Sequence, residues 1–170
     1  MDLKERVSEY PNFPKKGILF RDFSPILKDP SALSYITDEF TKYFHPKDVD
    51  VFAGIESRGF ILACLMASRY NKGMIMIRKS GKLPGKTIKL SYKIEYGQDT
   101  IEIQKDAIER GQKVIICDDL LATGGTAKAS AKLIEKVGGI ISGFAFMIEL
   151  TELKGMRLIS NYNCKSLVKY

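Results

Sequence analysis

The stretch that most constrains this chain is residues 113–129, which reads KVIICDDLLATGGTAKA. An apolar run leads to two adjacent carboxylates, and a Thr-Gly-Gly-Thr sequence then precedes a helical pattern. We therefore expect a buried strand that stops at Asp118 and Asp119, a short loop, and the start of a helix. Elements of this kind belong to folds in which strands and helices alternate.

The residues around the two glycines indicate an anion site. Hydroxyls and glycines at 123–126 suit a backbone whose successive N–H groups point at one anion, which the helix dipole also attracts. The carboxylates are not expected to touch that phosphate, and they suit sugar hydroxyls or a metal bound by the ligand. The alternative is a buried strand followed by a capped helix, but neither a cap nor a turn requires this pattern. We infer a sugar phosphate as the ligand.

A second strand, loop and helix start occurs at residues 49–70. The apolar run VDVFAGI is followed by Glu56, Ser57, Arg58 and Gly59, and then by a strongly apolar helical segment. Backbone N–H groups and the Arg58 guanidinium can hold a second anion there, because arginine suits bidentate phosphate contacts.

The densest positive charge begins in RKSGKLPGKT, residues 78–87. Part of this segment nearly matches an ATP-binding P-loop, but only three residues separate Gly81 from Gly85. The alternating pattern that follows is typical of a strand, whereas a P-loop opens a helix. We therefore reject the P-loop. Residues 88–103 instead predict a β-hairpin, either an ordinary edge hairpin or a flap that closes over a substrate and excludes water.

The N-terminal segment is rich in proline and aromatic residues. Residues 2–9 carry a short helical pattern, residues 10–25 predict an ordered loop, and residues 29–44 predict a helix with one apolar stripe. The loop pattern alone leaves two interpretations open, a structural lid and a wall of a binding pocket.

Four segments together resemble one family, the type I phosphoribosyltransferases, in the branch that uses adenine. CDDLLATGGT resembles the family's phosphoribosyl pyrophosphate signature, and RKSGKLP resembles its pyrophosphate-binding loop. GILFRDFSP and YKIEYGQDTIEIQKDAI resemble the branch's adenine-binding segment and flexible catalytic loop. The segments occur in family order and the resemblance covers nearly the whole chain.

The alternation of strands and helices predicts an α/β fold with a mostly parallel twisted sheet, covered by helices on both faces, and ligands at the carboxyl ends of its strands. The resemblance implies the same fold with a small N-terminal hood and a mobile β-hairpin flap. We expect a single domain, residues 1–170, with the hood at about 1–30 and the flap at about 82–103.

The resemblance also implies a set of site residues. The phosphoribosyl-binding residues would be Asp118, Asp119, Ala122, Thr123, Gly124, Gly125 and Thr126. The pyrophosphate-binding residues would be Ser57, Arg58, Arg78, Lys79 and Lys82. The adenine-binding residues would be Leu19, Phe20, Arg21 and Leu120, with the base edge read mainly by backbone groups of the hood. Glu95 would be the catalytic residue that handles a proton on the purine, and Tyr96 would belong to the flap. A cis peptide common in the family would fall between Glu56 and Ser57.

The implied reaction is transfer of the 5-phosphoribosyl group from phosphoribosyl pyrophosphate to adenine, giving AMP and pyrophosphate, in purine salvage. Mg²⁺ is expected to arrive with the substrate and not in a protein metal site. A homodimer is expected, as is typical of the family. Two alternatives remain open: a transferase for hypoxanthine, guanine or xanthine, and a non-catalytic sensor of phosphoribosyl pyrophosphate that regulates transcription.

Composition limits the kinds of partner that the chain is expected to bind. The net charge of +7 invites a nucleic-acid interpretation, but most of the lysines are dispersed and a small polyanionic substrate explains the dense group equally well. Three widely spaced cysteines and the single His45 suggest neither a metal cluster nor a Ser-His or Cys-His pair. No apolar run is long enough to span a bilayer. We expect a cytoplasmic enzyme with no nucleic-acid or membrane partner.

Overall fold

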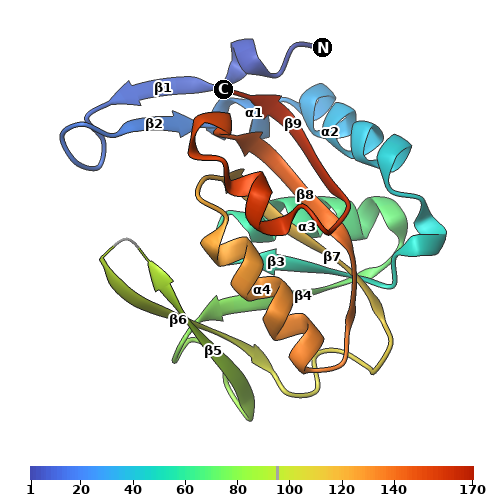
Figure 1. Cartoon of the computed structure of the whole chain (residues 1–170). Coiled ribbons are helices and arrows are strands. Elements are labelled where there is room, and N and C mark those ends of the chain that lie inside the picture. Colours follow the sequence, from blue (N-terminus) through green and yellow to red (C-terminus); the bar gives the residue numbers. More distant parts are fainter. Residues whose placement is uncertain (95) are drawn as a thin grey trace.

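The computed structural model describes residues 1–94 and 96–170. Within these residues the centre is a seven-stranded sheet in the order β5-β6-β4-β3-β7-β8-β9 (Figure 1). Its strands are β3 (Val51–Ile55), β4 (Gly73–Lys79), β5 (Thr87–Ile94), β6 (Gly97–Gln104), β7 (Lys113–Leu121), β8 (Ile140–Glu149) and β9 (Cys164–Lys169). Neighbours from β4 to β9 pair in parallel, while β5 and β6 are antiparallel. The mostly parallel α/β sheet is confirmed.

Helices cover both faces of this sheet, because alternate side chains of its strands point to opposite faces. On β7, Ile115 and Cys117 pack with residues of α2 (Pro30–Tyr43) and α3 (Gly59–Tyr70). Val114 and Ile116, which point the other way, pack with α4 (Gly125–Lys136). Figure 1 shows α4 crossing the front of the sheet and α3 lying behind it. The near-continuous apolar runs of the sequence are therefore strands buried on both faces.

The predicted helix at residues 29–44 is confirmed as α2. The Asp29 carboxylate caps it by accepting a hydrogen bond of 2.8 Å from the Ser31 N–H, and Pro30 occupies the first turn. Ile36 and Phe40 are fully buried on its apolar stripe. After this helix, His45 is exposed and lies before the short 3-10 helix η2 (Pro46–Asp48), as expected for a loop histidine.

The N-terminal segment has more structure than the sequence predicted. The expected helix at 2–9 is only a 3-10 turn, η1 (Lys4–Arg6), and the expected loop contains an antiparallel hairpin of β1 (Ser8–Pro11) and β2 (Leu19–Asp22), followed by α1 (Ser24–Leu27). The loop prediction was wrong because proline is tolerated at the ends of edge strands, where no ladder N–H is needed.

The hairpin predicted at residues 88–103 is confirmed. β5 and β6 pair from Thr87 with Gln104 to Ile94 with Gly97, and β6 meets β4 only at Arg78 and Lys79. This hairpin and the β1–β2 hairpin project beyond the sheet on the side where β3 and β4 end (Figure 1). The mobility of the flap stays a prediction.

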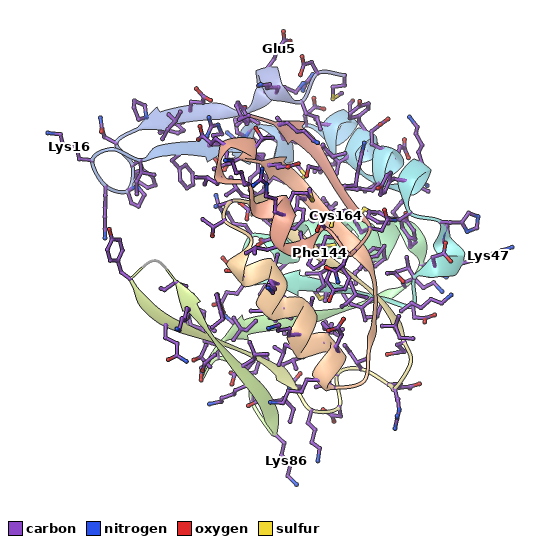
Figure 2. The ribbon with its side chains drawn as sticks, in the orientation of Figure 1. Glu5, Lys16, Lys47, Lys86, Phe144 and Cys164 are labelled. Carbon is purple, nitrogen blue, oxygen red and sulfur yellow. The ribbon has the colours of Figure 1, made fainter. Side chains whose placement is uncertain are left out.

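Residues 151–163, for which the sequence suggested no element, contain two 3-10 helices, η3 (Thr151–Leu153) and η4 (Gly155–Ile159). No helix in the described part of the chain is long and apolar enough to cross a membrane. Phe144 is fully buried and Cys164 is half-buried. Figure 2 shows Lys16, Lys47 and Lys86 pointing outward on different sides of the molecule.

Candidate active site

The carboxylate pair lies on a strand and not in a loop. β7 continues its pairing with β8 beyond the apolar run, with Asp118 opposite Phe146 and Leu120 opposite Ile148. The prediction that the strand stops at the carboxylates was wrong, since main-chain pairing does not depend on apolar side chains. The loop before α4 is therefore short, residues 122–124.

This short loop turns tightly into α4. Gly124 has a positive φ of 84° and precedes the helix, which has no side-chain cap and so leaves its first N–H groups available to an anion. A Cβ on Gly124 would lie 2.4 Å from the Gly155 carbonyl oxygen. A Cβ on Gly155 would lie 2.2 Å from the Ala122 carbonyl oxygen. Two facing glycines thus let residues 151–159 support the loop from behind.

The carboxylate pair is bound to the loop after β3. Arg58 makes an ion pair of 2.8 Å with Asp119, and the Asp119 N–H donates to Asp118 Oδ1 at 2.9 Å. Burial and the neighbouring Asp119 charge raise the pKa of Asp118 well above its ordinary value. The Arg58 guanidinium also lies 5.0 Å from the Phe20 ring. Arg58 therefore connects the hood to the two carboxylates.

The raised pKa of Asp118 predicts a pH-dependent gain in stability for Asp118→Asn. The folded protein keeps a proton on this carboxyl at pH values where the unfolded chain has lost it, so the residue's contribution to stability falls as the pH rises above about 4. Asn cannot ionise, and we expect the variant to have the higher Tm near neutral pH. Thermal unfolding at several pH values measures this gap. A gap that widens on acidification would contradict the assignment.

The loop after β4 is held by Glu56. Glu56 Oε2 accepts the Lys79 N–H at 2.6 Å, and Oε1 lies 3.2 Å from the Arg78 guanidinium and 3.4 Å from Lys82 Nζ. Burial alone would raise the pKa of Glu56, but the Lys79 N–H and the two cations outweigh it and hold the pKa below its ordinary value. The peptide between Glu56 and Ser57 is cis, as the family resemblance implied.

These loops meet around a cavity of about 260 Å³ at the carboxyl ends of β3, β4 and β7. Among the predicted site residues, the cavity is lined by Ser57, Arg58, Arg78, Lys79, Asp118, Asp119 and Thr126. Tyr92 from β5 also lines it, and the Tyr92 hydroxyl lies 3.0 Å from Thr126 Oγ1. A larger cavity, of about 410 Å³, lies between the N-terminus, α2 and β9, away from all the predicted motifs.

Other predicted residues lie beside the cavity or away from it. Lys82 reaches it only through its ion pair with Glu56, and Leu120 is half-buried against the core on the α3 face. Leu19 is exposed, and the Arg21 guanidinium lies 4.0 Å above the Tyr170 ring, so the Arg21 side chain faces the C-terminus. Tyr96 is 87% exposed. Glu95 lies outside the described residues.

The sequence reasoning missed several contributors. Glu56, Glu102, Tyr92 and Gly155 all hold site loops in place. Glu102 alternates with Ile101 and Ile103, and that pattern is typical of an outward-facing polar residue. Only the contacts between distant loops reveal these roles.

Comparison with known proteins agrees with this geometry. The model of the phosphoribosyl transferase domain family matches residues 33–169. The chain is 78% identical to the adenine phosphoribosyltransferase of Nitrosopumilus maritimus, and the match covers the full length of both. The crystal structure of adenine phosphoribosyltransferase from Thermoanaerobacter pseudethanolicus superposes with a TM-score of 0.94 at 45% identity, covering 99% of this chain and 98% of that one.

A second solved structure adds a ligand complex. The Saccharomyces cerevisiae adenine phosphoribosyltransferase, complexed with an imino-altritol bisphosphate and adenine, superposes with a TM-score of 0.90 at 40% identity. The match covers 96% of this chain and 95% of that one. The chain therefore belongs to the phosphoribosyl transferase family, in its adenine phosphoribosyltransferase branch.

Proposed function

We propose that three loops divide the substrates of the branch's reaction, in which the 5-phosphoribosyl group of phosphoribosyl pyrophosphate is transferred to adenine to give AMP and pyrophosphate. The observation that carries this division is the meeting of the loops after β3, β4 and β7 around one cavity. The chain acts as one domain, with residues 1–30 as a hood and residues 82–103 as a flap, in purine salvage.

The end of β7 and its loop hold the ribose phosphate. Residues 122–126 bind the 5′-phosphate through backbone N–H groups and the Thr126 hydroxyl, while Asp118 and Asp119 accept hydrogen bonds from the ribose hydroxyls. Cleavage of the glycosidic bond leaves positive charge on the ribose ring, as in glycoside chemistry. The two carboxylates stabilise that charge, and Arg58 turns from Asp119 toward the substrate.

The loops after β3 and β4 hold the pyrophosphate that leaves. Arg58, Arg78, Lys79 and Lys82 offset its developing negative charge, and Ser57 adds a hydroxyl and a backbone N–H. Within the described residues no three acidic, His or Cys side chains are grouped to hold a metal. Because Mg²⁺ keeps several waters and prefers phosphate oxygens, it would arrive with phosphoribosyl pyrophosphate, on the side that the Asp118 and Asp119 carboxylates face.

The hood binds the base. Phe20 lies beside Arg58, which lines the cavity. Backbone groups of Leu19 and Arg21 read the edge of adenine, with Leu120 against its face. The yeast structure that contains adenine supports a base site in this fold. A site built for the exocyclic amine leaves buried partners unpaired when hypoxanthine binds, which can discriminate by about ten thousandfold.

Glu95 handles a proton on the purine when the flap closes. We expect Glu95→Ala to lower kcat by about a hundredfold with little change in substrate binding, which is typical of a lost general acid or base. The matched control is Glu109→Ala, which removes an exposed carboxylate outside the flap. Near-normal kcat in Glu95→Ala would remove Glu95 from the mechanism.

The enzyme is a cytoplasmic homodimer. Support for a dimer comes from apolar exposure on the α3 side of the sheet, where Ile61 and Met76 are 38% and 39% exposed and Cys64 is exposed. Light scattering after gel filtration should give twice the chain mass for the native protein and a single chain mass for Ile61→Asp. A monomeric native protein would contradict the proposal.

The function itself is tested by supplying phosphoribosyl pyrophosphate, Mg²⁺ and one purine base at a time. AMP formed only from adenine supports the proposal. Faster conversion of hypoxanthine, guanine or xanthine would favour a transferase for another base. No product with any base, together with tight binding of phosphoribosyl pyrophosphate, would favour the sensor.

A further inference from the structure

Glu102 is a buried carboxylate to which the mechanism above assigns no role. It is 1% exposed on β6, beside the loop that connects β4 and β5. One of its oxygens, Oε1, accepts three backbone hydrogen bonds, from Gly81 at 2.9 Å and from Lys82 and Leu83 at 3.0 Å each. The other oxygen, Oε2, lies 3.2 Å from the Thr87 hydroxyl and 3.8 Å from Lys89 Nζ.

Three consecutive N–H groups that converge on one atom form an anion-binding nest. Gly81 supports its shape with a positive φ of 88°. The same segment nearly matches a P-loop in sequence, and its backbone N–H groups also converge on an anion. That anion is the Glu102 carboxylate, so a side chain of the protein itself occupies the nest.

Glu102 is ionised at neutral pH. Burial alone would raise its pKa, but the Leu83 N–H, the Thr87 hydroxyl and the other two backbone donors outweigh burial and hold the pKa of Glu102 below its ordinary value. A charged acceptor makes each of these hydrogen bonds stronger than a neutral one would.

The nest sets the position of the cationic loop. Glu56 holds one side of the loop through the Lys79 N–H, and Glu102 holds the other side through residues 81–83. The Arg78 guanidinium also donates to the Lys82 carbonyl oxygen at 3.1 Å. With both carboxylates in place, the Lys82 ammonium is directed to Glu56 at the edge of the cavity.

We propose that Glu102 is a positioning residue for the pyrophosphate half of the reaction: it fills the nest of residues 81–83 and thereby fixes Lys79 and Lys82 at the cavity. The inference rests on the proposed binding of pyrophosphate by this loop. It predicts that loss of the carboxylate weakens the binding of pyrophosphate and phosphoribosyl pyrophosphate but not the binding of AMP.

The test uses Glu102→Ala and the nearly isosteric Glu102→Gln, with Glu109→Ala as the exposed control. We expect Glu102→Ala to raise the Kd for inorganic pyrophosphate and the KM for phosphoribosyl pyrophosphate by about thirtyfold, the cost of losing charged hydrogen bonds. Glu102→Gln should show a smaller rise in both. The Kd for AMP should stay within about twofold, because the loop after β7 is untouched.

Formate provides a second readout that a general loss of packing would not give. In Glu102→Ala a formate ion fits the vacated nest, and we expect it to restore pyrophosphate binding while leaving the native protein and Glu109→Ala unchanged. Equal weakening of AMP and pyrophosphate, or no rescue by formate, would overturn the proposal. If Glu102→Ala does not fold, Glu102→Gln provides the test: its Kd for pyrophosphate should rise while its Kd for AMP stays within about twofold.

Hydrogen exchange separates this inference from the proposed function. The amides of residues 81–83 should exchange faster in Glu102→Gln than in the native protein. Faster exchange with unchanged pyrophosphate binding would show that the nest exists but that the loop does not bind pyrophosphate. Unchanged exchange would reject the nest and leave the pyrophosphate assignment standing.

Discussion

Replacing Asp118 and Asp119 together by Asn is expected to lower kcat for AMP formation by about a thousandfold, the size of a lost preorganised electrostatic contact. Asn keeps the shape and one hydrogen-bond acceptor of each side chain but cannot become negatively charged when substrate binds. In the proposed site, the two carboxylates face the ribose ring, where positive charge develops as the bond to pyrophosphate breaks. Single-turnover kinetics with AMP quantified directly would measure the loss on the chemical step.

Two features make this result interpretable. The fold should survive, since Asn at position 118 removes a carboxylate whose charged form is disfavoured by burial. The control Asp106→Asn changes an exposed residue beyond the hairpin and should leave kcat unaltered. If the double variant kept kcat within about tenfold of the native value, charge stabilisation by this pair would be ruled out as the main catalytic term.

Gly155→Ala is expected to lower kcat/KM for phosphoribosyl pyrophosphate on the order of several hundredfold, because a shift of about 1 Å in a site can cost a hundredfold. The new Cβ would lie 2.2 Å from the Ala122 carbonyl oxygen and 2.9 Å from the Gly124 nitrogen. Both atoms belong to backbone that cannot rotate away. Either residues 122–124, which are proposed to bind the 5′-phosphate, or the segment that carries Gly155 must therefore move.

The control for this variant is Gly73→Ala, since a Cβ on Gly73 meets no atom within 4 Å. It should behave as the native enzyme in kinetics and in thermal unfolding. Binding of inorganic pyrophosphate checks that Gly155→Ala still folds, because the proposed pyrophosphate residues belong to the loops after β3 and β4. A Gly155→Ala enzyme with a native KM would show that the loop does not depend on this support.

Elements with strong periodicity could be predicted from the sequence. Hydrophobic periodicity predicts the element type directly for the apolar runs at β3 and β8, the amphipathic α2 and the alternating β5. The β1–β2 hairpin was missed because neither of its four-residue strands has an alternating pattern and β1 ends in a proline. The polar end of β7 was missed because its pairing with β8 is a tertiary contact that the apolar pattern does not report.

The same contrast between local patterns and tertiary contacts applies to the site. The segments that carry Ser57, Lys79 and Thr126 are far apart in sequence. A parallel sheet brings the carboxyl ends of its strands to one edge, so their meeting was predictable. The contacts that fix those loops were not. The contact of Glu102 with the nest and the position of Gly155 behind residues 122–124 depend on backbone positions that no sequence pattern encodes.

The most direct test of a site divided into separate parts is to measure AMP and Mg²⁺-pyrophosphate as independent ligands by calorimetry in two variants. Thr126→Ala should raise the Kd for AMP about tenfold and leave the Kd for pyrophosphate unchanged. Lys82→Ala should raise the Kd for pyrophosphate about tenfold and leave the Kd for AMP unchanged, because each variant loses roughly one charged hydrogen bond. This crossed result is what the account predicts. If each variant weakened both ligands equally, or if pyrophosphate displaced AMP from the native enzyme, the proposed division of the cavity would be wrong.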